Sequence, residues 1–242
     1  MNYAEFQKRI RVSKQDLYRK VYAENRDSIR VKKENTVVKN LERIFSATLK
    51  ISNKKGFQAM SMRDLSRETN LSMGALYSYF SSKEELLEML QNQRRMITSR
   101  ILEERIDREA DPARRLQVAI LTHLYLSEAM QPWFYFSFME AKNLSKKEKD
   151  LAVASERYTE QIFADLIEDG QHQGIFAKRD PLLTAGIIKA MLQDWYLKRS
   201  KYVKRRITVD QYAQFVLQFV EAFVLDLKAF EFQKIRLSRK FS

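Results

Sequence analysis

The chain has 242 residues, a formal net charge of +13, five glycines, three prolines and no cysteine. The lack of cysteine excludes disulfides, thiol nucleophiles and cysteine-bound metals, and it fits a reducing, cytoplasmic compartment. The first residues are polar and charged, and no apolar run reaches the roughly 20 residues of a transmembrane helix, so we expect no signal peptide and no membrane partner. Few helix breakers and long hydrophobic patterns of period 3.6 predict an all-α protein.

The positive charge is concentrated in the N-terminal part of the chain. Residues 1–100 hold 21 Lys and Arg against 11 Asp and Glu, whereas residues 101–242 hold 23 against 20. A basic excess confined to one region is typical of a nucleic-acid-binding domain, although a basic surface also serves solubility.

Residues 1–35 form a basic N-terminal extension. Its apolar residues are spaced so that one face of a helix is possible (Phe6, Ile10, Leu17 and Val21). One interpretation is an arm that contacts DNA phosphates or a minor groove. The other is a partly helical, solvated tail. We favour the tail, because a positive segment near DNA raises affinity without any special geometry.

Residues 36–82 predict a small three-helix domain. The first helix is expected from about Thr36 to Lys55, with Gly56 as the residue that ends it. Its apolar stripe recurs at helical spacing and faces a core that Phe57 would complete. The members of that stripe are Val38, Leu41, Phe45 and Leu49.

The stretch from Ser61 to Lys83 predicts a helix-turn-helix. Ser61 is a good N-cap for a helix that ends near Thr69, and Asn70 suits the left-handed residue of the turn. Ser72 caps a second helix, predicted from Met73 to Phe80. In such motifs the second helix enters the major groove, with its N-terminal residues at the base edges.

The residues of the second helix suit contact with DNA. Small residues let the backbone approach closely, and tyrosines reach outward with a hydroxyl. The next helix starts at Ser82 or Lys83, where free N–H groups and the lysine charge would attract a phosphate.

This region resembles the DNA-binding domain of the TetR family of repressors, over residues 38–90. The resemblance rests on residues 56–57, 61–65, 71–80 and 82–87, and above all on the Leu-Tyr-x-x-Phe pattern of the recognition helix and the Ser-Lys-Glu-x-Leu-Leu start of the next helix. Asn70 departs from the family, which usually has Gly there. Met73 and Ala75 are not strong hydrogen-bonding base readers, so the target sequence cannot be read from them.

The resemblance implies a set of DNA contacts, including Arg63 at a helix start, where the family contacts a phosphate or a base. The expected DNA-binding residues are Lys55, Ser61, Arg63, Ser72, Met73, Gly74, Ala75, Tyr77, Ser78, Tyr79 and Lys83.

Residues 83–242 predict a larger helical domain for ligand binding and dimerisation. A long helix begins near Lys83 and passes Ile101, so that it belongs to the DNA-binding domain at one end and to the body at the other. Asp-Pro pairs at 111–112 and 180–181 open further helices. Ser145 is expected to cap a helix that reaches about Gln171, and the last helix is expected from about Val209 to Phe230.

The last two helices are too apolar to pack on one side only, which predicts a partner surface. Two such helices from each of two subunits would make a four-helix interface, as the resemblance also implies, and a symmetric dimer would bind a palindromic operator. The expected dimerisation residues are Ile188, Leu192, Phe215, Phe219 and Phe223.

The resemblance also implies a pocket for a small-molecule effector that controls DNA affinity. A hydrophobic effector, for example a fatty acyl-CoA, suits the aromatic residues of the body and a basic partner for its head group, although each residue is also an ordinary core residue. The candidates are Trp133, Phe134, Phe136, Phe138, Trp195 and Arg199.

The sequence contains no catalytic motif. His123 and His172 lie far apart without a flanking motif, and there is no HExxH, no Gly-rich phosphate loop and no GxSxG. We expect no enzyme, no cofactor and no metal. The two remaining hypotheses are a ligand-responsive transcriptional repressor and an architectural, nucleoid-associated DNA-binding dimer without an effector.

Overall fold

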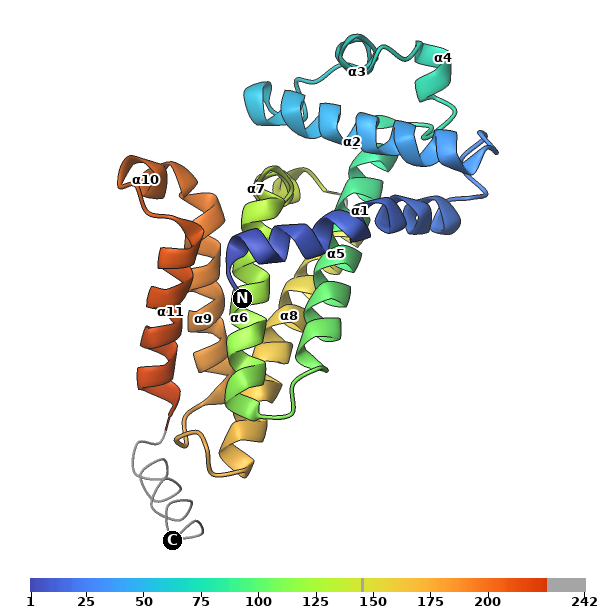
Figure 1. Ribbon diagram of the computed structural model, residues 1–242. Helices are drawn as coiled ribbons and strands as arrows, with labels where there is room; N and C mark the ends of the chain where they lie inside the picture. The colour runs from blue at the N-terminus through green and yellow to red at the C-terminus, as the bar shows by residue number, and fades with distance from the viewer. Residues whose placement is uncertain (145, 226–242) are drawn as a thin grey trace, which may run out of the picture. The chain divides into compact units, whose positions relative to one another are not determined.

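The protein is all-α, as the sequence predicts (Figure 1). The computed structural model describes residues 1–144 and 146–225, with the backbone alone for residues 10–17 and 148. This part of the chain divides into two compact units. Unit 1 consists of Met1–Ile97 with Ala129–Ala152, and unit 2 consists of Thr98–Glu128 with the chain from Val153 onward.

Unit 1 holds the N-terminal helices and a later segment of the chain. The later segment supplies one more α-helix, a short 3₁₀ helix and the start of a long helix. The elements are α1 (Tyr3–Glu24), α2 (Glu34–Lys55), α3 (Met62–Thr69), α4 (Met73–Leu76), the first part of α5 (Lys83–Ile106), α7 (Gln131–Glu140), η1 (Ala141–Asn143) and the start of α8 (Lys146–His172).

Unit 2 holds the rest of α5 and α8 together with four further helices, which are α6 (Pro112–Ala129), α9 (Pro181–Leu197), α10 (Arg199–Lys204) and α11 (Val209–Val224). The predicted Ser145 cap and the predicted continuation of the last helix to Phe230 lie outside the described residues.

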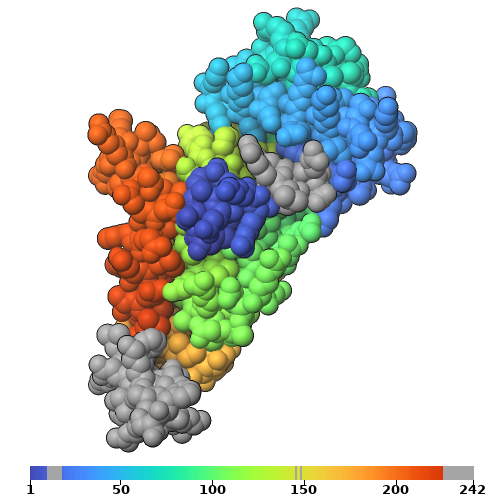
Figure 2. Space-filling model, viewed as in Figure 1, coloured from blue at the N-terminus to red at the C-terminus, as the bar shows by residue number. Residues whose placement is uncertain are grey.

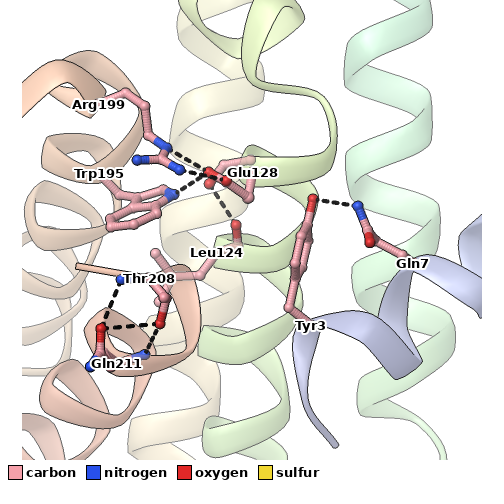
Figure 3. Close-up of polar contacts among 9 residues, drawn as sticks. Tyr3, Gln7, Leu124, Glu128, Trp195, Arg199, Thr208 and Gln211 are labelled. Carbon is pink, nitrogen blue, oxygen red and sulfur yellow. Dashed lines mark hydrogen bonds and ion pairs between the residues drawn. The ribbon is translucent and has the colours of Figure 1, made fainter. Parts of the chain in front are cut away.

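Local capping explains where several helices begin. The Asp180 side chain accepts a hydrogen bond from the Leu183 N–H at 2.9 Å, and Pro181 occupies the first turn of α9, where a missing N–H costs nothing. Thr208 and Gln211 form a reciprocal capping box at the start of α11 (Figure 3). These starts depend on side chains within three residues of one another, which is why sequence patterns detect them.

The prediction of a solvated N-terminal tail is wrong. Residues 3–24 form a 22-residue helix, α1, and its side chains Phe6, Tyr18, Val21 and Tyr22 are buried. The Tyr18 and Phe45 rings lie 6.1 Å apart, so α1 packs on α2. The extension is folded because α1 packs against α2. A count of charged residues does not reveal this packing, because it ignores the apolar face of the helix.

The aromatic segment after Met130 also belongs to unit 1. Residues 131–140 form α7, and the Trp133 and Phe136 rings pack edge-on against Phe45 and Phe57, each at 5.7 Å between centroids. The Glu140 carboxylate accepts a hydrogen bond from the Phe57 N–H at 3.3 Å. The compact units therefore do not follow the predicted divisions at residues 35 and 82.

Candidate nucleic-acid interface

The helix-turn-helix has the capping geometry that its sequence predicts. The Asp64 N–H donates to Ser61 Oγ at 3.1 Å, and the Ser61 N–H donates to Asp64 Oδ2 at 2.8 Å, which completes a capping box at the start of α3. Asn70 ends α3 in the left-handed conformation, with φ of 49°. Ser72 Oγ accepts the Ala75 N–H at 3.1 Å and starts α4.

Lys55 is engaged within unit 1. Its Nζ lies 2.7 Å from Asp64 Oδ2, and the Arg67 guanidinium lies 3.0 Å from the other oxygen of the same carboxylate. The hydrogen bond from Lys55, followed by those from Ser61, holds the pKa of Asp64 well below its usual range. The expected phosphate contact of Lys55 therefore competes with this ion pair.

The recognition helix is shorter than predicted. α4 ends at Leu76, and residues 77–79 continue as a tight turn rather than as α-helix to Phe80. The Ser78 N–H bonds the Ala75 carbonyl at 3.2 Å, and its hydroxyl donates to the same carbonyl at 2.6 Å. A serine hydroxyl that occupies a backbone carbonyl in this way favours a turn over continued α-helix.

Tyr79 is a core residue and not a DNA contact, which corrects the prediction. Its side chain is 1% exposed, and its hydroxyl accepts a hydrogen bond from the Asn40 amide at 2.7 Å. Burial raises the pKa of the Tyr79 hydroxyl. Tyr77, by contrast, is 43% exposed and offers its ring and hydroxyl to a partner.

The remaining predicted contacts differ in their access to solvent. Arg63, Ser61, Ser72 and Gly74 are exposed. A Cβ at Gly74 would meet nothing within 4 Å, so the α4 surface is open there. The half-buried members of the predicted set are Met73, Ala75 and Ser78.

Lys83 is half-buried at the start of α5. Its Nζ donates to the Gln58 carbonyl at 2.9 Å and lies 4.8 Å from the centroid of the Phe57 ring. This burial lowers the pKa of the Lys83 ammonium group. Lys83 thus stabilises the packing of unit 1, and any phosphate contact would use an ammonium group that already has partners.

One contact to this site was not predicted from the sequence. The Arg30 N–H, in the connection between α1 and α2, donates to the Ser78 carbonyl at 2.9 Å, directly after the recognition helix. The available signal is a pair of apolar residues, Ile29 and Val31, within a basic stretch, and Ile29 is fully buried.

The predicted effector residues are divided between the two compact units. Trp133, Phe134 and Phe136 belong to unit 1, whereas Trp195 and Arg199 belong to unit 2. Phe134 and Phe136 are buried in packing, and Phe138 is half exposed. These residues share only their residue type in the sequence. In the folded chain they belong to two different compact units.

Arg199 is engaged within unit 2, so its predicted contact with an anionic head group would compete with existing partners. Its Nε and Nη2 donate to the two oxygens of Glu128 at 2.9 and 2.8 Å, and the Trp195 indole N–H donates to the same carboxylate at 3.0 Å (Figure 3). The Arg199 guanidinium also lies 4.6 Å from the centroid of the Trp195 ring. This cluster joins α6 to α9 and α10 within unit 2.

Unit 1 contains a cavity of about 400 Å³. Its lining includes Trp133, Tyr18 and Ile97 and also polar side chains, which are Glu42, Ser46, Lys50, Asn53 and Gln93. Gln93 is 2% exposed, and its Oε1 has no hydrogen-bond partner, so a buried acceptor is available there. The volume lies in the range of small-molecule sites.

The α9 and α11 helices present an exposed apolar face. They lie side by side in unit 2, and the outer surface of α11 is uncovered in Figures 1 and 2. The large exposed apolar side chains on these helices are Leu182, Leu183, Ile187, Phe215, Phe219 and Phe223. Ile188 and Leu192 were predicted to lie in an interface, but both are buried within the subunit.

Within residues 1–144 and 146–225 no group of three or more His, Cys, Asp or Glu side chains could hold a metal ion. No helix in this part of the chain is long and apolar enough to cross a membrane.

Sequence comparison connects both parts of the chain to one family. Residues 44–90 match the model for "Bacterial regulatory proteins, tetR family", and residues 109–220 match the model for "Tetracyclin repressor-like, C-terminal domain". An uncharacterized HTH-type transcriptional regulator of Haemophilus influenzae is 45% identical over 47 residues. That match covers 19% of this chain and a quarter (25%) of the relative's length.

Structural comparison finds the same fold. The crystal structure of AibR in complex with isovaleryl coenzyme A and operator DNA has a TM-score of 0.65 at 18% identity, over 76% of this chain and 97% of AibR. FadR from Bacillus subtilis in complex with stearoyl-CoA has a TM-score of 0.59 at 17% identity, over 74% of this chain and 96% of FadR.

At these identities the structural likeness establishes the fold, and the two matched models establish the family. The helix-turn-helix with its capped α3 and α4, followed by a larger helical region, agrees with both. The chain belongs to the TetR family of bacterial transcriptional regulators.

Proposed function

We propose that the protein is a ligand-responsive transcriptional repressor that acts in the cytoplasm and binds a palindromic operator as a homodimer. The observation that carries this proposal is the capped helix-turn-helix, whose exposed Arg63 and Tyr77 stand at the start of α3 and the end of α4. The basic excess of residues 1–100 would provide the sequence-independent part of the affinity. Members of this family are DNA-binding regulators and not enzymes.

The exposed face of α9 and α11 supports a homodimer. Phe215 and Phe219 point away from the core on α11, and Leu183 and Ile187 do so on α9. A groove of about 340 Å³ lies between the two helices and is lined by side chains from both. An apolar face of this extent would be costly in water, and a two-fold axis would let the same patch on a second subunit cover it.

A small hydrophobic effector is the second part of the proposal. The two structural relatives described above were crystallised with acyl-CoA ligands. In this chain the unit 1 cavity offers an apolar wall at Trp133 and a buried acceptor at Gln93 Oε1. The acyl part of such a ligand would contact α5 there, and α5 contributes residues to both compact units.

The proposed response is a shift of α5 on ligand binding. A ligand that prefers one position of α5 would bias the spacing of the two recognition helices in the dimer. A coupling free energy of about 1–3 kcal/mol changes operator occupancy roughly five- to 150-fold, which is enough for regulation. The alternative function, an architectural DNA-binding dimer, would show no change of DNA affinity with ligand.

The central test is a fluorescence anisotropy titration of the protein against a labelled duplex from upstream of its own gene. The titration is repeated at several salt concentrations, with and without short- and long-chain acyl-CoAs. We expect tight, sequence-selective binding that an acyl-CoA weakens. Equal and weak binding to any duplex would favour the architectural alternative, and selective binding that no acyl-CoA changes would remove this class of effector.

The fluorescence of the two tryptophans can show in which compact unit the effector binds. The chain has only Trp133, which lines the cavity, and Trp195, which lies in the Glu128 cluster. We expect an active acyl-CoA to change the fluorescence of a Trp195→Phe variant, which retains Trp133. A response confined to the Trp133→Phe variant would place the ligand in unit 2 instead.

A further inference from the structure

The connection between α1 and α2 is bound to the end of the recognition helix. We call residues 25–33 the α1–α2 loop. The Arg30 N–H donates to the Ser78 carbonyl at 2.9 Å, and Ser78 follows α4 by two residues. The loop lies at the N-terminal end of α2, on the side where α4 is found (Figure 1). The loop is therefore a direct neighbour of the segment that follows α4.

The loop is held in place at both ends. Ile29 is fully buried, and its N–H donates to the Asn25 carbonyl at 3.0 Å. The Tyr22 hydroxyl, from the last turns of α1, donates to the Lys32 carbonyl at 3.3 Å. A loop anchored by a buried side chain and three hydrogen bonds does not need to be ordered when it binds a partner, which favours affinity.

The anchored backbone presents a cluster of cations to solvent. Arg26, Arg30, Lys32 and Lys33 are all exposed, and Asp27 is the acidic residue among them. The next residue, Glu34, lies 3.6 Å from the Arg19 guanidinium, on the α1 side. The loop thus carries a net charge of +3 beside the recognition element.

We propose that the α1–α2 loop is a second DNA-contacting element, which binds backbone phosphates next to the bases that α4 reads. This inference rests on the proposed function. Long, exposed Lys and Arg side chains suit phosphate oxygens, and phosphate contacts position a protein on the duplex without reading the sequence. The loop would lengthen each half-site footprint and would add affinity equally on specific and non-specific DNA.

The test compares two double variants with the same change of charge. Arg30→Ala/Lys33→Ala removes two cations from the loop, and its Arg30 N–H remains available to Ser78 because that hydrogen bond is a backbone one. Lys8→Ala/Arg9→Ala removes two exposed cations from the first turns of α1, which Figure 1 shows away from α4. Both pairs belong to unit 1, so any difference reports position and not net charge.

The measurement is the dependence of binding on salt concentration, for the operator duplex and a scrambled duplex. Each phosphate contact contributes about 0.9 to the slope of log K against log salt, so the loop variant should lower the slope by about 2 and weaken both duplexes alike. The α1 variant should change the slope by less than about 0.5. Hydroxyl-radical footprinting of the loop variant should lose protection at phosphates flanking the core half-site.

A third variant separates position from charge. Ile29→Ala keeps every cation but loosens the buried anchor of the loop, and we expect an intermediate loss of slope with unchanged far-ultraviolet circular dichroism. Equal effects of the two double variants, or an unchanged slope in the loop variant, would overturn the inference. If the wild-type protein still prefers the operator duplex, either of these results would contradict only the role of the loop and not the proposed function. If the wild-type protein shows no preference for any duplex, the proposed function itself is contradicted.

Discussion

The exposed phenylalanines of α11 offer a direct test of the proposed dimer. Phe219 lies on α11, lines the groove between α9 and α11, and exposes 54% of its surface. We choose Phe219→Asp, because more than half of the Phe219 surface is exposed and is available to a second subunit. The same substitution at Val203, which is 59% exposed on α10, is the matched control.

The magnitude follows from the exposed area. A phenylalanine side chain has roughly 200 Å² of surface, so the 54% that Phe219 exposes corresponds to about 110 Å². Allowing for incomplete coverage, burial at about 25 cal/mol per Å² stabilises the dimer by roughly 2 kcal/mol for each copy. A two-fold interface uses the residue twice, so the variant should lose about 4 kcal/mol, or roughly a thousandfold in the dimer dissociation constant. Two carboxylates brought near the axis would add to this loss.

Sedimentation velocity over a range of protein concentrations measures the effect. We expect the wild-type protein and Val203→Asp to sediment as dimers at micromolar concentration, and Phe219→Asp to sediment as a monomer with unchanged helical content. Operator binding should weaken in parallel, because one recognition helix then binds one half-site. A Phe219→Asp protein that remains a dimer would refute the assignment of this face, and an equal loss in Val203→Asp would show that any added charge has the same effect.

Three further predictions concern stability. Glu128→Ala should destabilise unit 2 by about 2–4 kcal/mol in urea unfolding, because it leaves the buried Trp195 N–H unpaired and Arg199 without its carboxylate, and Glu128→Gln should lose about half as much; equal stabilities would contradict this. Asn70→Ala should cost about 1 kcal/mol, because Ala lacks the short polar side chain that lets Asn adopt the left-handed conformation, whereas Asn70→Gly should stay within about 0.5 kcal/mol of the wild type, because Gly has no Cβ to strain there; thermal unfolding that ranks Gly below Ala would be inconsistent with that conformation. The lowered pKa of Asp64 means that its stabilising contribution is present above its ordinary pKa of 3.8 and is lost as the pH falls below that value. The difference in melting temperature between the wild type and Asp64→Asn should therefore shrink on acidification through pH 4, and a difference that is constant from pH 3 to 7 would show that Asp64 is not stabilised by Lys55 and Ser61.

The helix-turn-helix could be predicted from the sequence because its determinants are local. Ser61 with Asp64, Asn70, and Ser72 with the Ala75 N–H act across three residues or fewer, so their spacing is visible in the chain itself. The same holds for the Asp-Pro starts of α6 and α9. Fold class and family follow from these signals together with the 3.6-residue period.

The extent of the recognition helix could not be predicted in the same way. The pattern of apolar residues continues to Phe80, but Tyr79 is packed into the core of unit 1, where Asn40, 39 residues earlier, donates a hydrogen bond to its hydroxyl. Likewise, Lys55 forms an ion pair with the Asp64 carboxylate, and Lys83 donates a hydrogen bond to the Gln58 carbonyl. Only the folded unit brings these groups together. A count of basic residues does not distinguish a cation that is free to bind from one that is paired.

Apolar residues show the same division between sequence and tertiary structure. The sequence by itself determined that the chain is helical, where the DNA-reading motif lies, and that α9 and α11 are more apolar than one core requires. Only the tertiary structure decided that Ile188 and Leu192 fill the core while Phe215 and Phe219 face outward, and that α1 is packed on α2 instead of solvated. The physical reason is that helix formation and capping depend on neighbours along the chain, whereas burial depends on which distant surfaces meet.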